Sequence, residues 1–205
     1  MPANATEWDA RHRVAAQKPP AEPASIVTEW LPLLPTGPAL DLACGVGRHT
    51  LLLAARGQFV NAVDWSGTAL GILESRARAA KLAVSRAGTA SAPESRAGGV
   101  RLIQANLEEI HLPEAFFSLI LCLQYLQRSL LQQMAAALRP GGVLVFETFT
   151  RAQLNYSGGP RNPEHLLESG ELRTAFPSLH TLFYRELNAG QGIASLVAQK
   201  SVRNR

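Results

Sequence analysis

The chain has 205 residues, of which 46% are hydrophobic and 18% charged, a composition that predicts one globular domain spanning residues 1–205. No apolar run reaches the length of a membrane span, and the first residues lack the apolar segment of a signal peptide, so we expect a cytoplasmic protein without membrane contact. The net charge of +4 comes from scattered basic residues and does not indicate nucleic-acid binding.

Residues 1–38 are predicted to form a helical arm ahead of the first strand. Trp8 and its charged neighbours indicate a short helix over Thr6–Gln17. The break at Lys18–Pro20 separates it from a second helix, predicted over Ala21–Leu34. Two helices in this place are able to form a lid over a ligand cleft.

The stretch from Ala39 to Gly57 reads as a buried strand, a glycine turn and an amphipathic helix. Gly45 and Gly47 allow a tight turn with close approach of a ligand. Asp41 interrupts the apolar strand, and a buried carboxylate needs a partner to offset its desolvation. Because open α/β sheets bind ligands at the carboxyl ends of their strands, we expect a ligand over this turn.

The run Leu42–Gly47, LACGVG, resembles the first motif of class I S-adenosylmethionine-dependent methyltransferases. The rival interpretation is a nicotinamide-binding turn, but Thr50 stands where its G-x-G-x-x-G pattern requires the last glycine. A dinucleotide would also bring a pyrophosphate, which Asp41 would repel, whereas S-adenosylmethionine has no phosphate. The methyltransferase interpretation is therefore favoured.

A second strand is predicted over Gln58–Val63, with Asp64 directly after it. A carboxylate at this strand end can accept hydrogen bonds from both hydroxyls of a ribose. The segment VDWS resembles the corresponding methyltransferase segment, in which Ser66 begins the next helix, here predicted over Ser66–Leu82.

Residues 84–99 are rich in Ser, Ala and Gly without apolar periodicity, and are predicted to be a flexible insert. A strand over Val100–Gln104 follows. Methyltransferases commonly have an acid shortly after this strand to accept a hydrogen bond from the adenine amino group. Asn106 stands there instead, and its side-chain carbonyl is able to accept the same bond.

An unbroken apolar strand over Phe116–Leu123 is typical of the buried centre of a parallel sheet. Ser118 replaces the acid that the family usually has in this strand. Gln124 and Tyr125 follow the strand end and are the predicted acceptor-side residues, with Tyr125 more suited to positioning than to proton abstraction because its ordinary pKa is near 10.

The segment LRPGGVLVFETF resembles the methyltransferase LKPGG motif, in which the glycines turn the chain back into the sheet. Glu147 and Thr148, near the end of its strand, face either the cleft or a packed helix. The remaining predicted elements are a helix over Ser129–Leu138, a strand over Val143–Phe149, a helix over Asn162–Phe176, and a hairpin of strands over Leu179–Leu187 and Gly192–Lys200.

The resemblance implies a Rossmann-like α/β fold with a seven-stranded, mostly parallel sheet, helices on both faces and a C-terminal antiparallel hairpin. The N-terminal run WDARHR looks like the segment that precedes the first motif in the tellurite-resistance and thiopurine methyltransferases. The implied cofactor is S-adenosylmethionine. The residues predicted to bind it are Trp8, Arg13, Asp41, Ala43, Cys44, Gly45, Gly47, Arg48, Asp64, Trp65, Asn106, Leu107 and Cys122.

The implied reaction is methyl transfer to a small molecule, a thiol, metalloid or carboxylate, by a monomer or homodimer. No metal is expected, because the histidines are dispersed and the two cysteines lie in predicted strands. Aminopropyl transfer is disfavoured by the basic charge balance. A cofactor-binding regulatory or scaffold protein with little turnover stays an alternative, which Asn106 and Ser118 favour, and a nicotinamide-dependent oxidoreductase ranks third.

Overall fold

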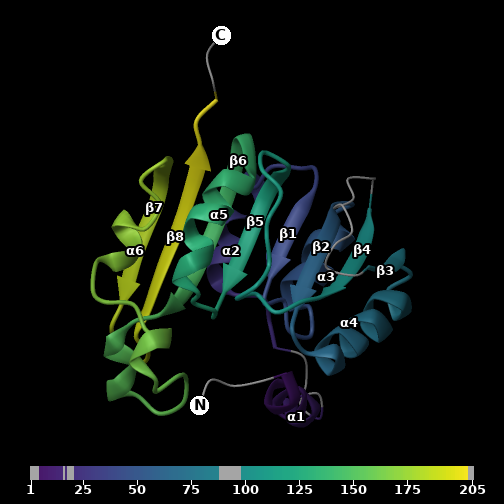
Figure 1. Ribbon diagram of the computed structural model, residues 1–205, viewed down its shortest axis with the longest axis horizontal. Helices are drawn as coiled ribbons and strands as arrows, with labels where there is room; N and C mark the ends of the chain where they lie inside the picture. Colours follow the sequence, from purple (N-terminus) through teal and green to yellow (C-terminus); the bar gives the residue numbers. More distant parts are fainter. Residues whose placement is uncertain (1–4, 16, 18–20, 88–97, 203–205) are drawn as a thin grey trace. The chain divides into compact units, whose positions relative to one another are not determined.

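The computed structural model describes residues 5–15, 17, 21–87 and 98–202, and it divides into two compact units, residues 1–110 and 111–205 (Figure 1). Each unit contributes four of the eight strands found among the described residues. The single domain predicted for residues 1–205 stays a prediction.

The described part of the predicted N-terminal arm is helical, but its second α-helix is shorter than the predicted Ala21–Leu34. It consists of α1 (Ala5–Ala15), α2 (Ser25–Trp30) and the 3-10 helix η1 (Leu31–Leu33). Ile26 and Val27 of α2 are fully buried, so this short helix is held by apolar packing rather than by its length.

The first unit contains a parallel sheet in the order β3-β4-β2-β1. Its strands are β1 (Ala39–Leu42), β2 (Phe59–Asp64), β3 (Val84–Ala87) and β4 (Gly99–Gln104), and the connecting helices are α3 (Arg48–Ala55) and α4 (Gly67–Ala79). Every residue of β1 and β2 is buried, which requires cover on both faces of these strands. Their mostly apolar runs, interrupted by Asp41 and Asn61, therefore predicted both strands correctly.

The prediction that residues 84–99 form a flexible insert is wrong at its start. Val84–Ala87 is strand β3, paired in parallel with residues 100–103 of β4. This strand lies at the end of the strand order and is mostly half-buried, so its sequence lacks the apolar signal of an interior strand. Residues 88–97 of the predicted insert lie outside the described residues.

The second unit contains the strand order β5-β6-β8-β7. Strands β5 (Phe117–Leu123) and β6 (Leu138–Phe149) are parallel, while β7 (Leu179–Leu187) and β8 (Ile193–Lys200) form the predicted antiparallel hairpin. Between β5 and β6 lie the 3-10 helix η2 (Arg128–Leu130) and helix α5 (Leu131–Ala137). The Arg139–Gly142 turn is an irregularity within β6, where the register with β5 shifts.

The helix predicted over Asn162–Phe176 is wrong. The structure has 3-10 helices η3 (Arg151–Asn155) and η4 (Pro163–His165) and one short helix, α6 (Glu171–Thr174). Leu166 and Leu167, which lie between η4 and α6 in the sequence, are buried. Leu167 pairs with Thr150 in an isolated bridge. This extended pairing uses backbone groups that a continuous helix would need for itself.

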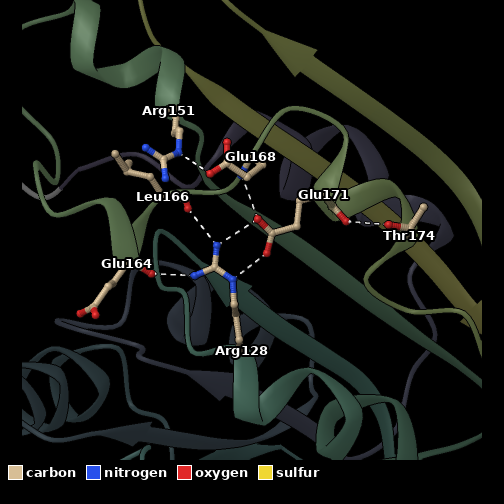
Figure 2. A network of polar contacts seen from close by, with 7 residues as sticks. All are labelled: Arg128, Arg151, Glu164, Leu166, Glu168, Glu171 and Thr174. Atoms are coloured by element: carbon tan, nitrogen blue, oxygen red, sulfur yellow. Dashed lines mark hydrogen bonds and ion pairs between the residues drawn. The ribbon is translucent and has the colours of Figure 1, made fainter.

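This segment is not a continuous helix and so lacks a full set of helical hydrogen bonds. Arg128 stabilises it instead (Figure 2). The Arg128 guanidinium donates to both carboxylate oxygens of Glu171, at 2.7 and 2.9 Å. It also donates to the backbone carbonyls of Glu164 and Leu166, at 2.9 and 3.0 Å. One side chain therefore joins η4, the residue that precedes bridge residue Leu167, and the start of α6.

None of the helices in the described ranges is both long and apolar enough to cross a bilayer. Within the same ranges, no three histidine, cysteine, aspartate or glutamate side chains are grouped so that they could hold a metal ion.

Candidate functional site

The turn between β1 and α3 has an unusual backbone. Ala43, Gly45 and Gly47 all have positive φ angles, of 53°, 54° and 82°. The turn is closed by the Cys44 N–H, which donates to the Val63 carbonyl, and by the Gly47 N–H, which donates to the Cys44 carbonyl, both at 3.0 Å. A left-handed alanine costs free energy, and such conformations concentrate at functional sites.

Gly47 is required for steric reasons as well as for its backbone angle. A Cβ atom at this position would lie 2.2 Å from Cδ1 of Leu73, a fully buried side chain of α4. The close approach of α4 to the turn therefore depends on the missing side chain. The predicted tight turn at Gly45 and Gly47 is confirmed.

Asp64, at the carboxyl end of β2, fixes the backbone of the turn through hydrogen bonds. Its Oδ2 accepts the Gly45 N–H and its Oδ1 accepts the Ser66 N–H, both at 2.8 Å. Ser66 in turn caps α4, because its Oγ accepts the Ala69 N–H at 3.0 Å, which confirms the predicted helix start. Burial raises the pKa of Asp64, and the two backbone hydrogen bonds oppose that rise.

Asp41 lies deeper, with 1% of its surface exposed, and accepts a hydrogen bond from the Thr50 hydroxyl at 2.6 Å. Burial raises its pKa to about 7, the Thr50 hydrogen bond opposes the rise, and the charge of Asp64 adds to it. Burial and then the two carboxylates raise the pKa of the Cys44 thiol, which is therefore held protonated. Two buried acids, Asp41 and Asp64, therefore lie close to the turn.

Helix α1 contacts α4 and reaches the turn (Figure 1). The His12 ring lies 3.4 Å from the position that a Cβ of Gly45 would occupy, and Trp8 stacks on His12 with ring centroids 6.0 Å apart. The Arg11 guanidinium lies 4.7 Å from the Trp8 ring centre. Arg13 is exposed. Helix α1 therefore places the His12 ring beside the turn, with Trp8 stacked on that ring.

Asp9 is the residue of this site that the sequence did not reveal. Its Oδ1 accepts hydrogen bonds from Ser66 Oγ at 2.5 Å and from the Thr68 N–H at 3.0 Å. The sequence indicated the aromatic and basic side chains of the run WDARHR, but nothing in it matches an acid of α1 to a helix that begins at Gly67.

Arg48 and His49, in the first turn of α3, hold the segment that precedes α2. His49 is buried, and its Nε2 accepts the Ala24 N–H at 3.1 Å, which requires an unprotonated nitrogen. Burial lowers the pKa of His49 to about 3, and the Arg48 charge adds to this. Arg48 donates to the Glu22 carbonyl at 3.2 Å. Its predicted contact with the cofactor stays a prediction.

The predicted adenine-side residues lie after β4. The Asn106 carbonyl oxygen accepts the Glu108 N–H at 3.1 Å, and its amide donates to the Glu109 carboxylate at 3.0 Å. The bond from Ala105 N–H to the Asp64 carbonyl, at 3.1 Å, joins this segment to the end of β2. Leu107 is buried, whereas Trp65 is partly exposed.

Cys122, Gln124 and Tyr125 belong to the second unit, at the carboxyl end of β5. Gln124 has a φ angle of 59°, an exposed side chain, and an N–H that donates to the Glu147 carbonyl at 2.6 Å. The Glu147 carboxylate is buried and accepts the Ser195 hydroxyl at 2.6 Å, so it faces the neighbouring strand β8. The buried thiol of Cys122 contacts the Tyr125 carbonyl at 3.8 Å.

A family model described as a methyltransferase domain matches residues 40–146, about half of the chain. The chain belongs to this methyltransferase family. Membership implies S-adenosylmethionine as the cofactor and favours the methyltransferase interpretation of the glycine turn over the nicotinamide one. A search of curated protein sequences found no significant match.

Solved structures of S-adenosylmethionine-dependent methyltransferases have the same fold. One from Methanosarcina mazei has a TM-score of 0.61 at 18% identity and covers 89% of this chain and 100% of its own. TehB from Haemophilus influenzae has a TM-score of 0.69 at 15% identity and covers 96% of this chain and 67% of its own.

A third structure is described by the conversion of a disulfide bond into a thioacetal group during echinomycin biosynthesis. Its TM-score is 0.68 at 18% identity, and it covers 98% of this chain and 93% of its own. The predicted Rossmann-like α/β fold, with a mostly parallel sheet and a C-terminal antiparallel hairpin, is confirmed. The expected number of seven strands becomes eight, because β3 is also present.

Proposed function

We propose that this methyltransferase transfers the methyl group of S-adenosylmethionine to a small molecule, either a thiol, a metalloid or a carboxylate. The observation that carries the proposal is the pair of buried acids beneath the glycine turn. Asp64 is fixed by two backbone N–H groups, and Asp41 lies behind it with a raised pKa. Acids in this place favour hydroxyl groups and positive charge over phosphate.

The residues present fit this cofactor. The turn offers backbone without side chains at Gly45 and Gly47, and the close approach of α4 leaves no room for a Cβ at Gly47. Asp64 would hold the ribose hydroxyls. The Asn106 carbonyl oxygen, which already accepts the Glu108 N–H, would accept the adenine amino group with its second lone pair. Trp8, on the arm that reaches the turn, would cover the bound molecule.

When bound, S-adenosylmethionine supplies a methyl group on a positively charged sulfur, which is already a good leaving group. The task of the chain is then to hold the acceptor in line and to keep water out, and positioning of this kind can supply about 7–11 kcal/mol. Gln124 and Tyr125 are the proposed acceptor-side residues. The strained backbone of Gln124, tied to Glu147, supports a fixed position for this segment.

The first test is calorimetric titration of the full chain with S-adenosylmethionine, S-adenosylhomocysteine and NAD⁺. We expect saturable binding of the first two and none of NAD⁺. An absence of heat and of any thermal shift at millimolar S-adenosylmethionine would refute the proposal, and preferential binding of NAD⁺ would indicate the oxidoreductase alternative.

The second test uses radiolabelled S-adenosylmethionine and a panel of thiols, selenite, tellurite, carboxylates and phenols. Methylation of one acceptor class identifies the substrate class. Tight cofactor binding without product from any member of the panel would favour the alternative of a regulatory or scaffold protein. A cytoplasmic location and a monomeric or homodimeric state stay predictions.

A further inference from the structure

A single oxygen atom joins the N-terminal helix to the site. Asp9 Oδ1 accepts both the Ser66 hydroxyl, at 2.5 Å, and the Thr68 N–H, at 3.0 Å. These two donors belong to the N-cap and the first turn of α4, a helix of 13 residues. An acid at a helix N-terminus is stabilised by the free N–H groups and by the helix dipole.

The same serine connects Asp9 to the turn. While its hydroxyl donates to Asp9, its backbone N–H donates to Asp64 Oδ1, and Asp64 Oδ2 accepts the Gly45 N–H. A continuous series of hydrogen bonds therefore runs from α1 through Ser66 and Asp64 to Gly45. About one helical turn beyond Asp9, the His12 ring lies 3.4 Å from the position that a Cβ of Gly45 would occupy.

Much of the surface of α1 faces solvent. Val14 is 61% exposed, and Thr6, Ala10, Arg11 and Arg13 are exposed, whereas Trp8, Asp9 and His12 are half-buried. The hydrogen bonds from Ser66 and Thr68 hold the pKa of Asp9 below its usual value, so the carboxylate is charged across the physiological pH range. Its bonds are thus charge-assisted and form a strong polar link between α1 and α4.

We propose that Asp9 is a positioning residue that docks α1 against the glycine turn and thereby sets the affinity for the cofactor. The inference rests on the proposed function, since it assumes that the turn binds S-adenosylmethionine. It differs from the expectation for Trp8 and Arg13, because Asp9 acts through Ser66 and Asp64 and touches no ligand itself.

The size of the effect follows from a docking equilibrium. If only the docked form binds tightly, the apparent affinity falls with the docked fraction. Loss of two charge-assisted hydrogen bonds is sufficient to reduce that fraction about tenfold or more. We therefore expect Asp9→Ala to weaken binding of S-adenosylhomocysteine by about tenfold.

The conservative variant Asp9→Asn provides the matched comparison. Because the Ser66 hydroxyl and the Thr68 N–H reach the same oxygen, an asparagine carbonyl can accept both bonds, although it lacks the charge that also acts on the Thr68 hydroxyl and Arg13. We expect it to recover most of the lost affinity. Glu29→Ala removes an exposed acid from α2 and controls for the change of net charge, and we expect wild-type affinity from it.

Titration of the full chain with S-adenosylhomocysteine is combined with hydrogen exchange of the α1 amides. In Asp9→Ala, we expect fast exchange throughout α1 while the interior of α4 stays protected. A variant with lowered Tm but wild-type affinity, measured well below its Tm, would show that Asp9 only stabilises α4 and would overturn the inference. Equal losses in Asp9→Asn and Asp9→Ala would overturn the hydrogen-bond role of the oxygen.

The proposed function fails separately from this inference. If the wild-type chain does not bind S-adenosylhomocysteine, the proposed function is wrong. If the wild-type chain binds and Asp9→Ala binds equally well with unchanged exchange in α1, the function stands and the role of Asp9 is wrong.

Discussion

Two strand ends of this methyltransferase share a strained backbone but are stabilised in different ways. Ala43 follows β1 and Gln124 follows β5, and both are non-glycine residues with positive φ, of 53° and 59°. Beneath the first, the acid Asp64 is held by backbone N–H groups. Beside the second, the acid Glu147 is held by the rotatable hydroxyl of Ser195.

The difference concerns how far each arrangement tolerates a substitution. A backbone N–H cannot rotate, so it requires an acceptor in one place at Asp64, whereas the Ser195 hydroxyl can rotate and can donate or accept. We therefore expect the glycine turn to be more sensitive to a change of its acid than the segment that follows β5.

The largest expected effect comes from adding one carbon to the turn. Gly47→Ala combines a φ of 82° with a Cβ 2.2 Å from Leu73, and should cost roughly 2–5 kcal/mol of unfolding free energy. Gly57→Ala has nearly the same φ, 83°, but meets nothing within 4 Å, and should cost about 1 kcal/mol. Urea denaturation measures both, and equal losses would mean that packing against α4 is unimportant.

A pH effect of similar size is expected from Asp41. Its pKa is raised from an ordinary value of 3.8, which applies to the unfolded chain, to about 7 in the folded chain, so between these values the folded state binds more protons than the unfolded state. Stability should therefore fall as the pH rises from 4 to 7, by up to roughly 4 kcal/mol. Asp41→Asn keeps an acceptor for Thr50, and its stability, measured by urea denaturation across this range, should depend less on pH. An equal pH dependence in the variant would contradict this assignment.

A smaller loss of stability is expected when the acid of each region is replaced by its amide, and it compares the two regions directly. Asp64→Asn places an amide N–H₂ against a backbone N–H, and should cost about 1–3 kcal/mol and weaken cofactor binding. Glu147→Gln keeps a partner for Ser195, because the hydroxyl can rotate, and should cost less than about 1 kcal/mol. Denaturation of both variants is the measurement. A larger loss in Glu147→Gln would reverse the comparison.

The smallest effect is expected in the second unit, at Arg128. Its ion pair with Glu171 is partly exposed, with side-chain exposures of 44% and 25%, so Arg128→Lys should cost about 1 kcal/mol or less. Lysine cannot reproduce the bidentate contact or reach both carbonyls (Figure 2). Hydrogen exchange should therefore rise in residues 163–171, while unchanged exchange would show that other contacts hold this segment.

The sequence predicted the parts of the fold that bury their residues on both faces. The apolar runs around Leu42, Val60 and Ile120 are strands, and Asp64 was placed at its strand end by the same pattern. Strand β3 was missed because its residues are only half-buried. Periodicity reports burial, and it says little about a strand at the edge of a sheet.

Local signals also failed where distant contacts decide the structure. Asn162 does cap a 3-10 turn, accepting the Glu164 N–H at 3.1 Å, but the bridge between Thr150 and Leu167 prevents a longer helix. The role of Asp9 depends on a partner 57 residues away. Neither contact can be predicted from the residues next to it in the sequence.

The central claim is that buried acids beneath the glycine turn favour a positively charged sulfur. The most direct test is calorimetry at pH 6 and pH 8 with S-adenosylmethionine and with S-adenosylhomocysteine, whose sulfur is neutral. Because burial raises the pKa of Asp41 to about 7, this acid gains charge between pH 6 and pH 8, so the affinity for S-adenosylmethionine relative to S-adenosylhomocysteine should increase on the order of threefold to tenfold. A ratio that stays constant, or falls, would contradict the account.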